Sequence, residues 1–155
     1  MFNLLGPQVA ESHAIDLFAG TGALGLEAIS RGAATATFIE RHLPTANVIK
    51  QNAAAIGVAE RVNVVFGDAF RWTAAFKADG EQPLTVFCSP PYDFYVERRQ
   101  EMLELITRWV EISPAGSQIV VETDERFDPG LLPRAVEWDI RKYPPAVVAI
   151  LSTEY

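Results

Sequence analysis

The sequence is short of three features, and each shortage narrows what the protein can be. It holds a single cysteine, Cys88, which excludes an internal disulfide framework and fits a reducing compartment. No Cys/His cluster has zinc-site spacing, so no metal is expected. No apolar run approaches the roughly 18 residues of a membrane-spanning helix, and residues 1–6 lack the basic start of a signal peptide. We therefore expect a cytoplasmic protein with no membrane partner.

Positive charge is also scarce. The chain carries 13 Lys and Arg against 20 Asp and Glu, which gives a net charge of -7. Non-specific binding to nucleic acid depends mainly on neutralisation of phosphates by Lys and Arg, so this balance argues against general affinity for nucleic acid. The basic pairs Arg98-Arg99 and Arg141-Lys142 are expected to be ordinary solvent-exposed side chains.

What the sequence does contain is a regular alternation of apolar runs and helical patterns. With 155 residues, 49% of them hydrophobic, it suits one globular domain over residues 1–155, and we expect a monomer. The expected strands are Ala14 to Phe18, Ala36 to Ile39, Val62 to Phe66, Leu84 to Cys88 and Ile119 to Glu122. The expected helices are Met1 to Leu5, Ala23 to Arg31, Pro44 to Ile56, Ala69 to Lys77 and Val96 to Ile112. Repeated strand-helix-strand units predict a mostly parallel sheet.

The pattern changes after Glu122. Phe127 to Leu132 is expected to form a short helix or turn, and two strands follow, Ala135 to Tyr143 and Ala146 to Ser152, joined at Pro144-Pro145. The expected fold is an α/β, Rossmann-like sandwich with a mostly parallel seven-stranded sheet, an antiparallel C-terminal strand and helices on both faces. This arrangement resembles the sheet of class I methyltransferases. A plain doubly wound sheet is the alternative.

A glycine loop follows the first expected strand and opens the helix after it. Residues 20–25 read Gly-Thr-Gly-Ala-Leu-Gly, a GxGxxG pattern in the strand-turn-helix setting that gives the pattern meaning. Gly20 and Gly22 are expected to let the backbone bend and approach a ligand, and Gly25 to let helix and strand pack closely. The loop predicts a nucleoside cofactor, but alone it does not separate a nicotinamide dinucleotide from S-adenosylmethionine.

Acidic residues near the loop narrow this choice. Glu40 lies about 20 residues beyond the first glycine, the spacing at which an acid binds ribose hydroxyls. Asp16 is awkward beside a pyrophosphate but useful for orienting the loop and the ammonium group of S-adenosylmethionine. Asp68 either caps the next helix or, by resemblance to methyltransferases, faces the adenine amino group. The expected cofactor contacts are Asp16, Phe18, Ala19, Gly20, Gly22, Glu40, Arg41, Asp68 and Ala69.

A second motif follows the fourth expected strand and therefore lies at the same edge of the sheet. Its four residues, Ser89, Pro90, Pro91 and Tyr92, are the expected catalytic residues, and they resemble the Asp/Asn/Ser-Pro-Pro-aromatic signature of enzymes that methylate exocyclic amines of bases. The lone pair of such an amine is delocalised, so acceptors at its N-H groups favour the pyramidal form that attacks. The expected acceptors are the Ser89 hydroxyl and the Pro90 carbonyl. Tyr92 is expected to stack on the base, with Phe94 or Tyr95 as a cover.

Taken together, several segments resemble the bacterial 16S ribosomal RNA guanine-N2 methyltransferase family. They are Phe2 to Leu5, Asp16 to Gly32, Glu40, Asn52, Asp68 and the Pro-Pro-Tyr loop. The resemblance implies S-adenosylmethionine as cofactor and guanine in small-subunit ribosomal RNA, or its assembly intermediate, as substrate. Family members carry Asp or Asn where this chain has Ser89, a weaker acceptor. They also begin with a basic extension that we expect this chain to lack.

Three other functions remain open at this point. A DNA amino methyltransferase shares the Ser-Pro-Pro-Tyr motif, although the chain shows no room for a target-recognition domain. A non-catalytic cofactor-binding protein fits Ser89 and the acidic charge, and a nicotinamide dehydrogenase fits the glycine loop alone. Cys88 is expected to be a buried strand residue, because neither histidine has the setting of an activating base.

Overall fold

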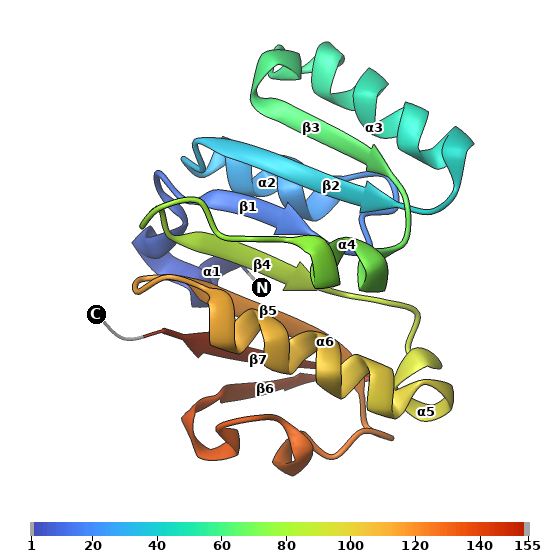
Figure 1. Cartoon of the computed structure of the whole chain (residues 1–155), viewed down its shortest axis with the longest axis vertical. Helices are drawn as coiled ribbons and strands as arrows, with labels where there is room; N and C mark the ends of the chain where they lie inside the picture. Colours follow the sequence, from blue (N-terminus) through green and yellow to red (C-terminus); the bar gives the residue numbers. More distant parts are fainter. Residues whose placement is uncertain (1, 154–155) are drawn as a thin grey trace.

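The computed structural model describes residues 2–153, which form a seven-stranded sheet with helices on both faces (Figure 1). The strands are β1 (His13–Asp16), β2 (Thr35–Glu40), β3 (Val62–Phe66), β4 (Leu84–Cys88), β5 (Gln118–Asp124), β6 (Asp139–Tyr143) and β7 (Ala146–Ser152). Their order is β3-β2-β1-β4-β5-β7-β6. The strands β1 to β5 are parallel, and β7 is antiparallel to both of its neighbours, β5 and β6. The predicted fold class is confirmed.

The helices divide between the two faces of the sheet. They are α1 (Phe2–Leu5), α2 (Ala23–Ser30), α3 (Leu43–Ala55), α4 (Ala69–Ala75), α5 (Phe94–Glu97) and α6 (Arg99–Ile112). Apolar side chains of α1, α2 and α3 pack into one core cluster. Those of α4, α5 and α6 pack into a second cluster on the opposite face. In Figure 1, α6 crosses in front of the sheet and α2 lies behind it. Met1 of the first predicted helix lies outside the described residues.

Several predicted element boundaries differ from the observed ones, and three of these differences have a clear structural cause. The first strand ends at Asp16, because the chain turns at Leu17 and Phe18 toward the glycine loop. The helix predicted from Val96 to Ile112 is two helices, interrupted at Arg98, whose backbone (φ -127°, ψ 36°) is not helical. The strand predicted from Ala135 begins at Asp139. Before it, Ala135–Glu137 form a 3-10 turn that follows Arg134 in the left-handed region (φ 55°).

The C-terminal ends of the parallel strands meet at one edge, and this determines where the loops gather. β1 pairs with β2 on one side and with β4 on the other, while β4 also pairs with β5. The glycine loop after β1 and residues 89–92 after β4 therefore lie on neighbouring strands. Ligands of open α/β sheets bind at this kind of edge.

Candidate functional site

A cavity of about 580 Å³ opens at this edge of the sheet, within the roughly 300 to 1,000 Å³ typical of small-molecule sites. Its walls come from the loops after β1, β2, β3 and β4 and from the region of α5. The lining residues are Leu17, Phe18, Gly20, Ile39, Glu40, Arg41, Gly67, Asp68, Ala69, Phe70, Ser89, Pro90, Pro91, Tyr92, Phe94 and Arg98. The two sequence motifs thus share one cavity. Asp16, Ala19 and Gly22, also predicted as cofactor contacts, are not among the lining residues.

The geometry of the glycine loop explains why it needs glycine. Gly20 (φ 56°) and Gly22 (φ 89°) adopt the left-handed backbone that side chains disfavour. Gly25 has a different reason, because a Cβ at this position would lie 2.3 Å from Cε1 of Phe38 on β2. The predicted close packing of helix on strand at Gly25 is confirmed.

Asp16 supports the loop from beneath. Its side chain is buried, and its Oδ2 accepts a hydrogen bond of 3.3 Å from the backbone N-H of Gly25. Its Oδ1 has no partner among the described residues. Burial raises the pKa of Asp16 to about 7, the Gly25 N-H opposes this shift, and the charge of Glu40 adds to it. Asp16 Oδ1 is therefore a buried hydrogen-bond acceptor without a partner among the described residues, next to the glycine loop that Oδ2 contacts through Gly25.

Glu40 and Asp68 place two carboxylates in the cavity wall. Glu40 ends β2, and its Oε2 accepts from the backbone N-H of His42 at 3.2 Å. Asp68 is the N-cap of α4, where its Oδ1 accepts from the Arg71 N-H at 2.9 Å. The two interpretations of Asp68 are compatible, because this residue caps a helix and also lines the cavity.

Aromatic rings and two arginines form another part of the wall. Phe18, Phe70 and Phe94 contact one another with ring centroids 5.9 to 6.4 Å apart. The Arg98 guanidinium lies 4.2 Å from the ring centroid of Phe70, and that of Arg41 lies 5.7 Å from Phe94. Arg98 was predicted to be an ordinary surface side chain, and this was wrong. Its position could not be predicted because it depends on the break between α5 and α6.

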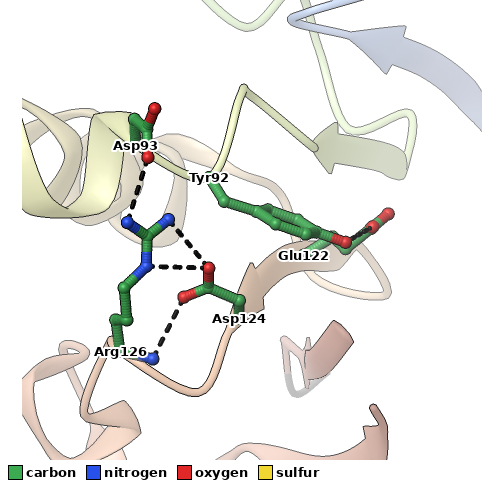
Figure 2. A network of polar contacts seen from close by, with 5 residues as sticks. All are labelled: Tyr92, Asp93, Glu122, Asp124 and Arg126. Carbon is green, nitrogen blue, oxygen red and sulfur yellow. Dashed lines mark hydrogen bonds and ion pairs between the residues drawn. The ribbon is translucent and has the colours of Figure 1, made fainter. Parts of the chain in front are cut away.

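Ser89 and Tyr92 both contact a residue that the sequence reasoning missed, Glu122 on β5. The Tyr92 hydroxyl donates to Glu122 Oε2 at 2.6 Å, as Figure 2 shows, and the Ser89 hydroxyl lies 3.4 Å from Oε1. This bond, together with partial burial, raises the pKa of Tyr92 to about 12, so the phenol stays protonated at neutral pH. The sequence feature that could have identified Glu122 is its position near the C-terminal end of β5, the strand next to β4.

Two nearby groups belong to the core rather than to the site. Tyr95 is buried against Phe127 and does not line the cavity, whereas Phe94 does. Cys88 is buried as predicted, and burial raises the pKa of its thiol to about 12. A thiol in this state is a poor nucleophile at neutral pH.

Residues 2–153 contain no group of three or more His, Cys, Asp or Glu side chains placed to hold a metal ion. Within the same part of the chain, every helix is too short or too polar to cross a bilayer.

Comparison with known proteins gives a family and named relatives. Residues 1–148 match the model of the family described as Conserved hypothetical protein 95. Ribosomal RNA small subunit methyltransferase D of Escherichia coli K12 is 30% identical over 142 residues, which are 92% of this chain and 67% of the relative. The Bacillus subtilis protein named "Putative rRNA methyltransferase YlbH" is 31% identical over 83% of this chain and 68% of its own length. This chain thus spans about two thirds of each relative.

Solved structures give the same fold. An RNA methyltransferase from Salinibacter ruber, solved in complex with S-adenosyl-L-homocysteine, superposes with a TM-score of 0.68 at 20% identity. The superposition covers 98% of this chain and 91% of that one. The structure named "Putative methyltransferase yhhF from Escherichia coli" superposes with a TM-score of 0.78 at 29% identity, over 99% of this chain and 82% of that one. The fold of this chain is therefore that of class I methyltransferases.

Proposed function

Because the chain belongs to the Conserved hypothetical protein 95 family, we propose that it transfers a methyl group from S-adenosylmethionine to ribosomal RNA of the small subunit. The acceptor in this proposal is an exocyclic amine, the N2 amino group of guanine. One observation carries the proposal: a single cavity is lined both by the glycine loop with Glu40 and Asp68 and by Ser89 to Tyr92.

The residues of the cavity fit S-adenosylmethionine. Glu40 offers a carboxylate to the ribose hydroxyls, and Asp68 offers one to the adenine amino group. Phe18 and Phe70 supply apolar faces for the adenine ring. The unpartnered Oδ1 of Asp16 suits the ammonium group, reached through a water molecule. When bound, the cofactor supplies an electrophilic methyl group on a positively charged sulfur.

The loop from Ser89 to Tyr92, which we call the amine loop, supplies the hydrogen-bond acceptors for the base. Ser89 Oγ and the Pro90 carbonyl oxygen accept hydrogen bonds from the two N-H groups of the exocyclic amine. These bonds favour the pyramidal form of the amine, whose lone pair is then free to attack the methyl group. Pro91 and Pro90 fix the turn because their φ angles are restricted. Tyr92 presents its ring to the base, and its hydroxyl is held by Glu122. The chain's contribution is to position the amine and remove its water.

The substrate assignment draws on the relatives and on the chemistry of the loop. Both curated relatives are named as ribosomal RNA methyltransferases. A Ser-Pro-Pro-Tyr loop suits an exocyclic amine, and the sequence resemblance favours guanine N2 over other amines. The net charge of -7 means that docking to RNA depends on local shape or on residues outside this chain.

Transfer of a tritiated methyl group tests the proposal. The chain is incubated with labelled S-adenosylmethionine and, separately, with unmodified small subunits, naked 16S RNA and duplex DNA. We expect label in small subunits or in naked RNA. Label confined to DNA would identify a DNA methyltransferase instead. Calorimetric binding of the cofactor with no transfer to any substrate would identify a binding protein.

A further inference from the structure

Glu122 binds both polar ends of the amine loop, although it is not among the residues that line the cavity. Its two carboxylate oxygens are divided between Tyr92, 2.6 Å from Oε2, and Ser89, 3.4 Å from Oε1. The second bond is long, but catalytic hydrogen bonds commonly tighten when substrate binds. Glu122 is half-buried, so its charge is only partly screened by solvent.

A second set of polar contacts, centred on Arg126, lies next to the contacts of Glu122. Arg126 forms ion pairs with Asp93, the residue after Tyr92, at 3.0 Å and with Asp124 at 2.8 Å (Figure 2). Asp124 lies two residues after Glu122 on β5, so both point to the same side of the strand. Arg126 offsets one of these two negative charges, so the network keeps a net charge of -1, and Asp124 adds to Glu122 in raising the pKa of Tyr92. Also beside Glu122 are the neutral Tyr92 phenol and, on α5, the buried Tyr95 hydroxyl, which contacts Cys88.

We propose that Glu122 is the positioning residue of the amine site and the final acceptor of the proton that the amine loses. This inference rests on the proposed function. The hydroxyl of Ser89 donates to Glu122, which leaves the lone pairs of Oγ free to accept from the amine. Glu122 thus supplies a carboxylate one hydroxyl away from the group that contacts the amine.

The proton balance of the step is simple. The N-CH3 bond forms as the S-CH3 bond breaks, and the sulfur keeps the electron pair of that bond. The nitrogen is then positively charged, and one of its N-H bonds breaks. That proton passes to Ser89 Oγ while the hydroxyl proton of Ser89 moves to Glu122 Oε1. The products are a neutral methylated amine, a thioether and a protonated Glu122.

Single-turnover methyl transfer to small subunits, measured at saturating cofactor, tests this role. We expect Glu122→Gln to lower the rate on the order of 100-fold, the usual size of a general-base contribution, with cofactor affinity unchanged. Adding Ser89→Asp to Glu122→Gln should recover at least about tenfold of the rate, because Asp accepts the amine directly.

Glu125→Gln is the matched control, since Glu125 is exposed on the loop just after β5, and its rate should equal that of the wild type. A Glu122→Gln rate within about twofold of wild type, or a parallel loss of rate and cofactor affinity, would overturn the inference. If the wild-type chain labels no RNA, the proposed function fails. NMR titration of Tyr92 then decides the positioning role, because an unchanged Tyr92 pKa in Glu122→Gln would disprove it.

Discussion

Ser89 is the residue on which the chemistry depends most directly. Its Oγ lies in the cavity wall and contacts Glu122, and it makes no contact with the glycine loop among the described bonds. We expect Ser89→Ala to lower the turnover number about 100-fold or more, with the Kd for S-adenosylmethionine within about twofold. Calorimetry and steady-state rates measure the two quantities. Equal losses of turnover and affinity would indicate a structural role instead.

Asp16 gives a prediction about stability. Burial disfavours the charged form and raises its pKa from an ordinary value of 3.8 to about 7 in the folded chain. The folded state therefore binds more protons than the unfolded state between about pH 4 and pH 7, so this residue costs stability as pH rises through that window and no more above it. Relative to the wild type, Asp16→Asn should gain on the order of 4 kcal/mol between pH 4 and pH 8, at about 1.4 kcal/mol per pKa unit.

Urea unfolding of both proteins at the two pH values measures the Asp16 effect. Asn keeps an oxygen that can accept from Gly25, so the loop contact survives the change. Asp79→Asn, in an exposed loop, is the control and should show no such trend. A difference in unfolding free energy between wild type and Asp16→Asn that stays constant with pH would contradict the prediction.

At the scale of elements, the contact between α2 and β2 sets the position of the glycine loop. A methyl group at Gly25 would meet the Phe38 ring at 2.3 Å, and the ring is fully buried. We expect Gly25→Ala to cost about 1 to 3 kcal/mol, the usual penalty of overpacking, despite the better helix propensity of Ala. Chemical denaturation measures the loss, and Phe38→Leu in the same chain should restore part of it. A Gly25→Ala protein more stable than wild type would refute the contact.

On the opposite face of the sheet, α6 packs through its buried side chains Met102, Leu105, Ile106 and Trp109. Trp109 is buried against Trp72 and Phe76, and its Nε1 donates to Thr73 Oγ1 at 3.1 Å. Trp109→Ala should cost about 3 to 5 kcal/mol of unfolding free energy. Thr107→Ala, half-buried on the same helix, should change it by less than about 0.5 kcal/mol. Similar values for the two variants would show that Trp109 does not hold α6 against α4.

These elements also show how far sequence could predict the molecule. The strands β3, β4 and β7 were predicted with the observed ends, because apolar runs bounded by turn residues carry a clear signal. The convergence of the glycine loop and Ser89 at one edge follows from parallel topology. The contact of Glu122 with Ser89 and Tyr92 does not, since it depends on the register of β4 against β5 and on side-chain direction. The break at Arg98 likewise depends on tertiary contacts.

At the scale of the whole molecule, the net negative charge and the internal pairing of arginines limit the electrostatic attraction to RNA. Several arginines form ion pairs with acids of the chain itself, among them Arg98 with Glu101, Arg126 with Asp124 and Arg141 with Asp139. Such side chains contribute less to phosphate binding than unpaired ones. We therefore expect RNA selectivity to depend mainly on the shape of a folded RNA or ribosomal subunit. The labelling experiment compares small subunits with naked RNA for this reason.

The identity of the methylated nucleoside decides whether the chain transfers the methyl group to the N2 amine of guanine. Small subunits labelled with the wild-type chain and tritiated S-adenosylmethionine are digested to nucleosides and separated by chromatography with mass detection. We expect label in N2-methylguanosine from 16S RNA, and much less of it with Ser89→Ala. Label on a ring carbon or on a ribose 2′-hydroxyl would contradict amine transfer, because the Ser89–Tyr92 loop would then have no amine to bind.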